Sequence, residues 1–324
     1  MLGFKTYERS SLQIPPHMIR CLNATDILIV IFAAFLSLIT LIFAPRIPNW
    51  GLLIGVNFIA FAYTWLIARL QHKTSNVLIR WLHDWNAIPM LLVVFKEVYF
   101  LIQAIYRGKS FDPLLIAIDR WILRVDPTAW LAQFSNPYFT ETLQVAYSLF
   151  YIFFLIIGYE LYRRQDKEHF NRLRFAIAHG FILSYIGYFL LPAVGPRFTL
   201  HDYSQIGREL PGVILTPYLR WFVDAGDSIP AGASNAVASA MAQRDAFPSG
   251  HTMMTLVLIS LGFQWRTRSR FFLLAIGSLL IVATVYLRYH YVIDVLAGAL
   301  LAVLCLRTMV GFYMFIRTRF HADS

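Results

Sequence analysis

Apolar runs, most of them about 20 residues long, restrict this chain to folds that a lipid bilayer can solvate. Eight such runs lie at residues 27–45, 51–70, 87–106, 140–162, 174–192, 252–265, 271–287 and 291–316. The run at 252–265 is short, which suits a helix whose N-terminus is recessed to form a pocket. We therefore expect an all-α, polytopic membrane helical bundle with about eight transmembrane helices.

Composition supports the bilayer as solvent. Hydrophobic residues make up 58% of the 324 residues and charged residues only 14%, more apolar surface than a soluble chain of this size could bury. The net charge of +10 would also suit nucleic acid. The basic residues, however, fall in short loops between apolar runs, as the positive-inside effect and anionic lipids favour. We therefore expect no nucleic-acid partner.

The distribution of lysine and arginine also predicts the orientation. The short loops 163–174 and 266–270 are rich in these residues and are expected to be cytoplasmic. An even number of spans then places both termini in the cytoplasm. The loops before residues 196, 250 and 291 fall on the extracytoplasmic face.

Polar motifs are concentrated on that face. A Pro-Ser-Gly turn at residues 248–250 runs directly into an apolar segment, which puts His251 at a helix N-terminus, where free N–H groups favour an anion. His290 and Asp294 are four residues apart, so in a helix the carboxylate lies close enough to hold one imidazole nitrogen. A down-and-back path through residues 252–287 would return His290 to His251. With Arg197 nearby, these groups outline a phosphoryl-transfer site.

At these residues the chain resembles the type 2 phosphatidic acid phosphatase superfamily. The resemblance rests on Pro196-Arg197, on Pro-Ser-Gly-His at 248–251 and on His-x-x-x-Asp at 290–294, and it covers roughly residues 140–316. Within the superfamily it leans towards lipid phosphotransferases such as sphingomyelin synthases and fungal inositol phosphorylceramide synthase. It implies a six-helix catalytic core and a phosphohistidine intermediate, with no cofactor and no metal.

The resemblance also implies roles for individual residues. His290 would be the nucleophile, Asp294 would orient it, and His251 would be the acid that protonates the leaving oxygen. The substrate phosphate would be bound by Arg197, Ser249 and Gly250. Arginine suits this task because its planar guanidinium can donate two parallel hydrogen bonds to two phosphate oxygens.

Two positions depart from the phosphatase branch. A lysine seven residues before the motif arginine is replaced by Leu190, and an arginine six residues before the nucleophilic histidine is replaced by Thr284. A phosphodiester, with one negative charge, needs less compensation than a monoester dianion, so the departures favour a diester donor. Arg288 and Lys96 are candidate auxiliary cations. Lys96 and its neighbour Glu97 are also expected to have structural partners on other spans.

Two parts are expected along the chain. Residues 1–86 would hold an N-terminal cytoplasmic segment and two extra transmembrane helices, and residues 87–324 the six-helix core with an extracytoplasmic insert at 198–246. The insert is a lid over the site or a passive connector. Residues 111–123 mix apolar and charged positions at helical intervals, which favours an amphipathic helix in the interface.

The sequence thus predicts an integral membrane enzyme that transfers a phospho-headgroup, inositolphosphate-like, from a lipid phosphate ester to an alcohol acceptor. One alternative uses the same site, with water as acceptor, as a lipid phosphate or isoprenyl diphosphate phosphatase. A second alternative is a phospholipid carrier without chemistry, although transport would need no nucleophile–carboxylate pair. The oligomeric state is left open by the sequence.

Overall fold

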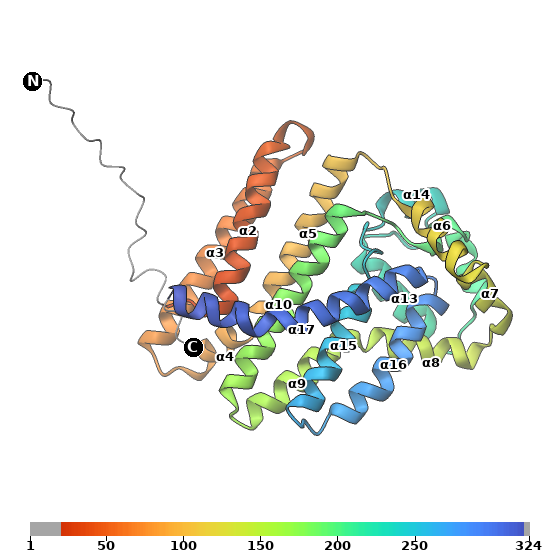
Figure 1. The fold of residues 1–324 in the computed structure, drawn as a ribbon. Coiled ribbons are helices and arrows are strands. Elements are labelled where there is room, and N and C mark those ends of the chain that lie inside the picture. Colours follow the sequence, from red (N-terminus) through yellow and green to blue (C-terminus); the bar gives the residue numbers. More distant parts are fainter. Residues whose placement is uncertain (1–20, 321–324) are drawn as a thin grey trace, which may run out of the picture.

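The computed structural model describes residues 21–320, and every regular element in that range is a helix (Figure 1). Five helices are long and apolar enough to cross a membrane: α2 (Ala24–Ile42), α3 (Trp50–Lys73), α5 (Ala87–Tyr106), α10 (Lys167–Leu190) and α17 (Val292–Phe320). A sixth candidate is the pair α8 (Pro137–Ser148) and α9 (Phe150–Arg163), joined at a bend of 49°. The all-α polytopic prediction is confirmed.

The two remaining predicted spans correspond to shorter helices. α15 (Gly250–Gln264) has 15 residues and α16 (Arg270–Tyr286) has 17. α15 is shorter than the roughly 20 residues needed to cross hydrocarbon, as its sequence suggested. Length and composition alone therefore give five or six spans, and the two shorter helices complete the set of eight predicted segments.

The N-terminal helix pair packs on the rest of the bundle. α2 contacts α3, α5, α10 and α17, so the two helices before residue 87 share a core with the later ones. Residues 1–20, most of the segment assigned to the cytoplasm, lie outside the described part of the chain. The division between residues 86 and 87, and the side of the membrane on which each end lies, remain predictions.

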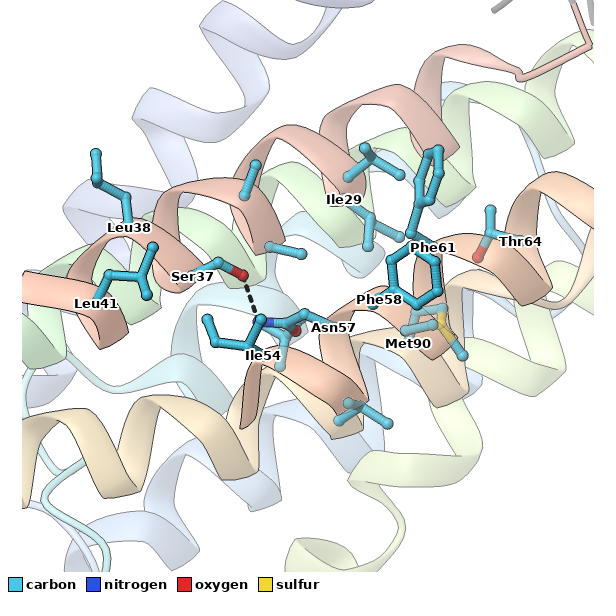
Figure 2. Close-up of a pocket in the computed structure, with 16 residues that line it drawn as sticks. Ile29, Ser37, Leu38, Leu41, Ile54, Asn57, Phe58, Phe61, Thr64 and Met90 are labelled. Carbon is cyan, nitrogen blue, oxygen red and sulfur yellow. Dashed lines mark hydrogen bonds between the residues drawn. The ribbon is translucent and has the colours of Figure 1, made fainter. Parts of the chain in front are cut away.

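A buried carboxyl group ties the N-terminal pair to α5. Glu97 accepts hydrogen bonds from Asn57 of α3 at 2.9 Å and from Thr40 of α2 at 3.3 Å, which meets the expectation of a partner on another span. Beside this contact, a largely apolar groove of about 470 Å³ lies between α2, α3 and α5 (Figure 2). Figure 2 also shows Asn57 donating to Ser37.

Short helices gather at one end of the bundle, where α6, α7, α13 and α14 lie together (Figure 1). They are α6 (Asp112–Leu123), α7 (Pro127–Leu131), α11 (Pro196–Thr199), α12 (Ile206–Glu209), α13 (Thr216–Gly226) and α14 (Asn235–Met241). The insert predicted at 198–246 contains α12, α13 and α14. At the opposite end of α5, α4 (Val77–Asp84) joins α3 to it. The 3₁₀ turns η1 (Ala44–Arg46), η2 (Ala132–Phe134) and η3 (Tyr203–Gln205) complete the described elements.

α6 is amphipathic, but its buried face is the one that carries carboxylates. Asp112, Leu115 and Asp119 are buried, whereas Trp121 and Ile122 are exposed. The buried residues recur at intervals of three and four and therefore share one side of the helix. An apolar exposed face is what a helix in the interface would present to lipid.

α15 and α17 approach each other closely at Gly298. A Cβ atom at this position would lie 2.5 Å from the carbonyl oxygen of Ser249 and 3.2 Å from Cβ of Thr252. At the equivalent position of Gly311 on the same helix, no heavy atom of the described residues other than the helix's own backbone lies within 4 Å. The missing side chain at Gly298 therefore allows α17 to pack against the first turn of α15.

We predict that Gly298→Ala lowers the apparent melting temperature in detergent, because backbone would have to move, at a cost of about 1–3 kcal/mol. Gly311→Ala is the matched control and should be neutral or stabilise by up to about 1 kcal/mol, since alanine favours helix more than glycine does. Equal melting temperatures for the two variants would contradict the close approach.

Candidate active site

His290 lies in the turn between α16 and α17, and one hydrogen bond fixes its tautomer. Its Nδ1 is 2.8 Å from the carbonyl oxygen of Ala246. A carbonyl oxygen only accepts, so Nδ1 carries the proton and Nε2 keeps its lone pair. Burial lowers the pKa of His290 to about 4, against the raising effects of Asp245 and the Ala246 carbonyl. The imidazole is therefore neutral near pH 7, as a nitrogen nucleophile must be.

Asp294 lies close to the His290 ring but does not make the hydrogen bond to Nδ1, which the Ala246 carbonyl makes. Its Oδ2 is 3.5 Å from His290 Nδ1 and accepts the backbone N–H of Tyr291 at 2.8 Å. Its Oδ1 has no hydrogen-bond partner within the described residues, and the side chain is fully buried. The Ala246 carbonyl therefore makes the hydrogen bond that orients the ring, and Asp294 lies beside the ring and holds the backbone of Tyr291.

His251 lies opposite His290, as the down-and-back path of α15 and α16 predicts. The centres of the two imidazole rings are 5.7 Å apart. The His251 ring stacks on Tyr147 at 4.6 Å and packs against Phe150 at 4.4 Å, the residues that flank the bend between α8 and α9. His251 Nε2 is buried and has no protein partner in residues 21–320. The ring is held by aromatic contacts while one nitrogen stays available.

Ser249 and Gly250 have structural roles besides the predicted contact with phosphate. Ser249 Oγ accepts the backbone N–H of Thr252 at 3.2 Å and so caps α15. Its own backbone N–H donates to the carbonyl oxygen of Asp294 at 3.0 Å, which joins the two histidine motifs directly. At Gly250 a Cβ would lie 2.6 Å from the Tyr188 hydroxyl, so packing also requires glycine here. Binding of phosphate by these two residues remains a prediction.

Arg197 lies in α11, and its backbone N–H donates to the carbonyl oxygen of Arg288. Its guanidinium pairs with two carboxylates of the insert, Asp224 at 2.9 Å and Asp227, and is stacked 4.8 Å from the centre of the Tyr289 ring. Burial disfavours the charge, but Asp227 and Asp224 outweigh it and raise the pKa of Arg197 above its usual value. The side chain is only 7% exposed.

The two candidate auxiliary cations bind the insert instead of the histidine pair. Arg288 is buried, and its side chain pairs with Glu209 of α12. Lys96 Nζ donates to the carbonyl oxygen of Gly226 and to Ser228 Oγ. These contacts indicate that both cations hold the insert, so the partner of Lys96 lies in the insert and not on another span as the sequence predicted.

Two carboxylates on α6 hold the loops of the site, and the sequence analysis missed both. Asp112 accepts the backbone N–H groups of Val194 at 3.0 Å and Gly195 at 2.8 Å, and the Tyr291 hydroxyl at 2.8 Å. It thereby connects the loop before Arg197 to the turn after His290.

Asp119 accepts the backbone N–H groups of Val292 and Ile293, each at 2.8 Å, and so satisfies free donors at the start of α17. The signal available in the sequence was the spacing of Asp112 and Asp119, seven residues apart in a largely apolar helix, which puts both on one face.

A further carboxyl group lies near the histidines. Burial raises the pKa of Asp245 to about 6, with a further rise from Asp227 and opposing effects from His290 and Arg197. Asp245 immediately precedes the Ala246 carbonyl that orients His290. Among residues 21–320, no three or more His, Cys, Asp or Glu side chains are grouped so that they could hold a metal ion.

Comparison with known proteins agrees with this geometry. A family model described as the PAP2 superfamily matches residues 113–308, which span α6 to α17 and include both histidines. Neither the curated proteins nor the solved structures gave a match to the chain. The superfamily predicted from the motifs is confirmed, and its lipid phosphotransferase branch stays a prediction.

We predict that Asp119→Ala destabilises the protein by about 1–3 kcal/mol, because two backbone donors at the start of α17 lose their acceptor. Hydrogen exchange should accelerate at residues 291–294 in this variant. Asp126→Ala is the control, since Asp126 pairs with Arg120 at an exposed position, where an ion pair contributes about 0–1 kcal/mol. Unchanged exchange at residues 291–294 would show that Asp119 does not hold this turn.

Proposed function

The chain belongs to the PAP2 superfamily, and from this premise we propose that it is a membrane phosphotransferase acting on lipid phosphate esters through a phosphohistidine at His290. Superfamily membership supports lipid phosphatase or phosphotransferase chemistry in general, and several long apolar helices make the chain a multi-pass membrane protein. Transfer of an inositolphosphate-like headgroup to an alcohol is the specific reaction proposed.

The observation that carries the proposal is the placement of the two imidazoles next to each other. The Nδ1–H of His290 donates a hydrogen bond to the Ala246 carbonyl oxygen, which leaves the lone pair of Nε2 free to attack phosphorus. His251 lies 5.7 Å away, between ring centres, with an unpartnered nitrogen that can carry a proton. A nucleophile and an acid on opposite sides of a phosphorus atom are what the transfer requires.

The reaction then has two steps. In the first, a bond forms between His290 Nε2 and phosphorus, the bond from phosphorus to the leaving lipid oxygen breaks, and His251 gives that oxygen its proton. In the second, the acceptor hydroxyl attacks phosphorus, its proton passes to His251, and the bond to His290 breaks. Arg197 would balance the negative charge on the phosphate oxygens in both steps.

Two features support a diester donor over a monoester. Leu190 is 67% exposed at the end of α10 and brings no charge to the site. Thr284 is fully buried, and its carbonyl oxygen accepts the backbone N–H groups of Tyr289 and His290, so it shapes the turn. Neither position supplies a cation for a second phosphate charge. Hydrolysis of a lipid monoester at the same site is the second candidate function.

The proposal also includes the membrane face on which the site lies. Arg197, His251 and His290 lie at the ends of helices that the distribution of basic loops assigns to the extracytoplasmic face. A donor lipid would enter sideways from that leaflet, and the acceptor alcohol or water would come from the lipid or the aqueous side.

We predict that His290→Ala abolishes headgroup transfer from labelled lipid phosphodiesters and also abolishes trapping of labelled enzyme. His251→Ala should lower the transfer rate about 10²–10⁴-fold, the usual contribution of a general acid. Purified protein would be supplied with mixed labelled monoesters and diesters, with and without candidate alcohols.

His169→Ala serves as the control, because His169 pairs with Asp166 at the start of α10, the opposite end of that helix from Arg197. It should retain wild-type transfer. Release of free phosphate from monoesters, lost in His290→Ala, would favour the phosphatase. Turnover that survives His290→Ala would remove His290 from the mechanism.

The pH dependence of the first step follows from the pKa of His290. Because burial holds this pKa at about 4, Nε2 stays unprotonated until the pH falls through that value. We expect the acid limb of the single-turnover rate to lie near pH 4, well below the value of about 6.5 for an ordinary histidine. An acid limb at or above pH 6.5 would contradict the buried, neutral imidazole.

A further inference from the structure

Two carboxylates of the insert share the guanidinium of Arg197, and the sequence motifs predicted neither. Arg197 Nη1 donates to Asp224 Oδ1 at 2.9 Å, and Nη2 donates to Asp227 Oδ2. Both aspartates come from the C-terminal end of α13. Their side chains are 18% and 17% exposed, so water screens them only in part.

Further contacts fix these carboxylates in place. The Tyr203 hydroxyl donates to Asp224 Oδ2 at 2.8 Å. Lys96 reaches from α5 to the carbonyl oxygen of Gly226 and to Ser228 Oγ, on either side of Asp227. The end of α13 is therefore held by Tyr203 on one side and by Lys96 on the other. These contacts fix both carboxylates next to Arg197.

The charge of this group is negative. With both aspartates ionised, Arg197, Asp224 and Asp227 together carry one net negative charge. His290 adds no positive charge near pH 7, since burial lowers its pKa to about 4. Arg288 is paired with Glu209, while Lys96 and Arg220 are the other cations near the two carboxylates and bond to backbone oxygens of the insert.

Arg197 nevertheless keeps the capacity to bind phosphate. A guanidinium has five N–H donors, and the two carboxylates take one each in the hydrogen bonds described. A phosphate that uses remaining donors would lie within a few ångströms of both carboxylates. The two carboxylates would then repel each negative charge on the phosphate, so the repulsion would be stronger for a dianion than for a monoanion.

We propose that Asp224 and Asp227 are specificity-determining residues that make the Arg197 site accept a phosphodiester monoanion and disfavour a phosphomonoester dianion. The inference rests on the proposed phosphotransferase function and names the residues that select its donor class. It differs from the argument on Leu190 and Thr284, because added negative charge acts here in addition to missing positive charge.

The test measures binding and needs no turnover. The full-length protein in detergent would be titrated at pH 8 with phenyl phosphate, a dianion there because its second pKa is about 6, and with methyl phenyl phosphate, a monoanion. Wild type would be compared with Asp224→Asn, Asp227→Asn and the double variant. Asparagine keeps an oxygen that can accept from Arg197 while it removes the charge.

In the double variant, the affinity for phenyl phosphate should rise at least about tenfold relative to that for methyl phenyl phosphate. The ratio is taken within each variant, so a smaller folded fraction does not affect it. Asp202→Asn is the matched control for each single variant: Asp202 is exposed on the same insert and accepts hydrogen bonds from Ser204, and its replacement removes one negative charge, as each of those variants does. Its ratio should equal that of the wild type.

Three results would overturn the inference. In the first, the affinities for both probes change by the same factor, as expected if the aspartates only orient Arg197. In the second, dianion binding weakens more than monoanion binding. In the third, no variant binds either probe.

If the ratio shifts as expected while no lipid headgroup is transferred, the charge selection stands and the phosphotransferase proposal fails. If headgroup transfer occurs while the ratio is unchanged, the phosphotransferase proposal stands and the charge selection fails.

Discussion

The close packing of the first turns of α15 and α17 is the constraint on which the rest of the site depends. Gly298 lets the helices approach until the backbone N–H of Ser249 reaches the carbonyl oxygen of Asp294. Two motifs about 40 residues apart in the sequence are then joined by main-chain atoms. The separation of the His251 and His290 rings is consequently set by backbone, which is stiffer than side chains that change rotamers.

Buried charge is the main electrostatic cost of the arrangement, and the insert offsets much of it. A guanidinium as buried as that of Arg197 would be strongly disfavoured alone, and pairing it with Asp224 and Asp227 restores part of the lost solvation. The same pairs anchor α13 near the histidines. The contacts of Lys96 and Arg288 with the insert have a similar effect, so charged groups hold this segment together with its small apolar cluster of Phe198, Ile229 and Ala238.

The sequence predicted those parts of the molecule that depend on local pattern. Hydrophobic runs located α5 at residues 87–106 as observed, and the Pro-Ser-Gly turn located the start of α15. The carboxylates that complete the site could not be found in this way. Asp112 contacts Tyr291 across 179 residues of sequence, and Arg197 pairs with aspartates 27 and 30 residues away in an irregular insert. No periodicity links such positions, because tertiary folding alone brings them together.

The placement of α6 connects the site to the surface of the bilayer. One side of this helix carries Asp112 and Asp119, which hold the loops before Arg197 and after His290. The other side exposes Trp121 and Ile122, which suit the boundary between headgroups and acyl chains. The exposed side and the two loops thus belong to one helix. A tilt of this helix would change the spacing of both loops at the same time, so the outer surface of the molecule and the site are mechanically coupled.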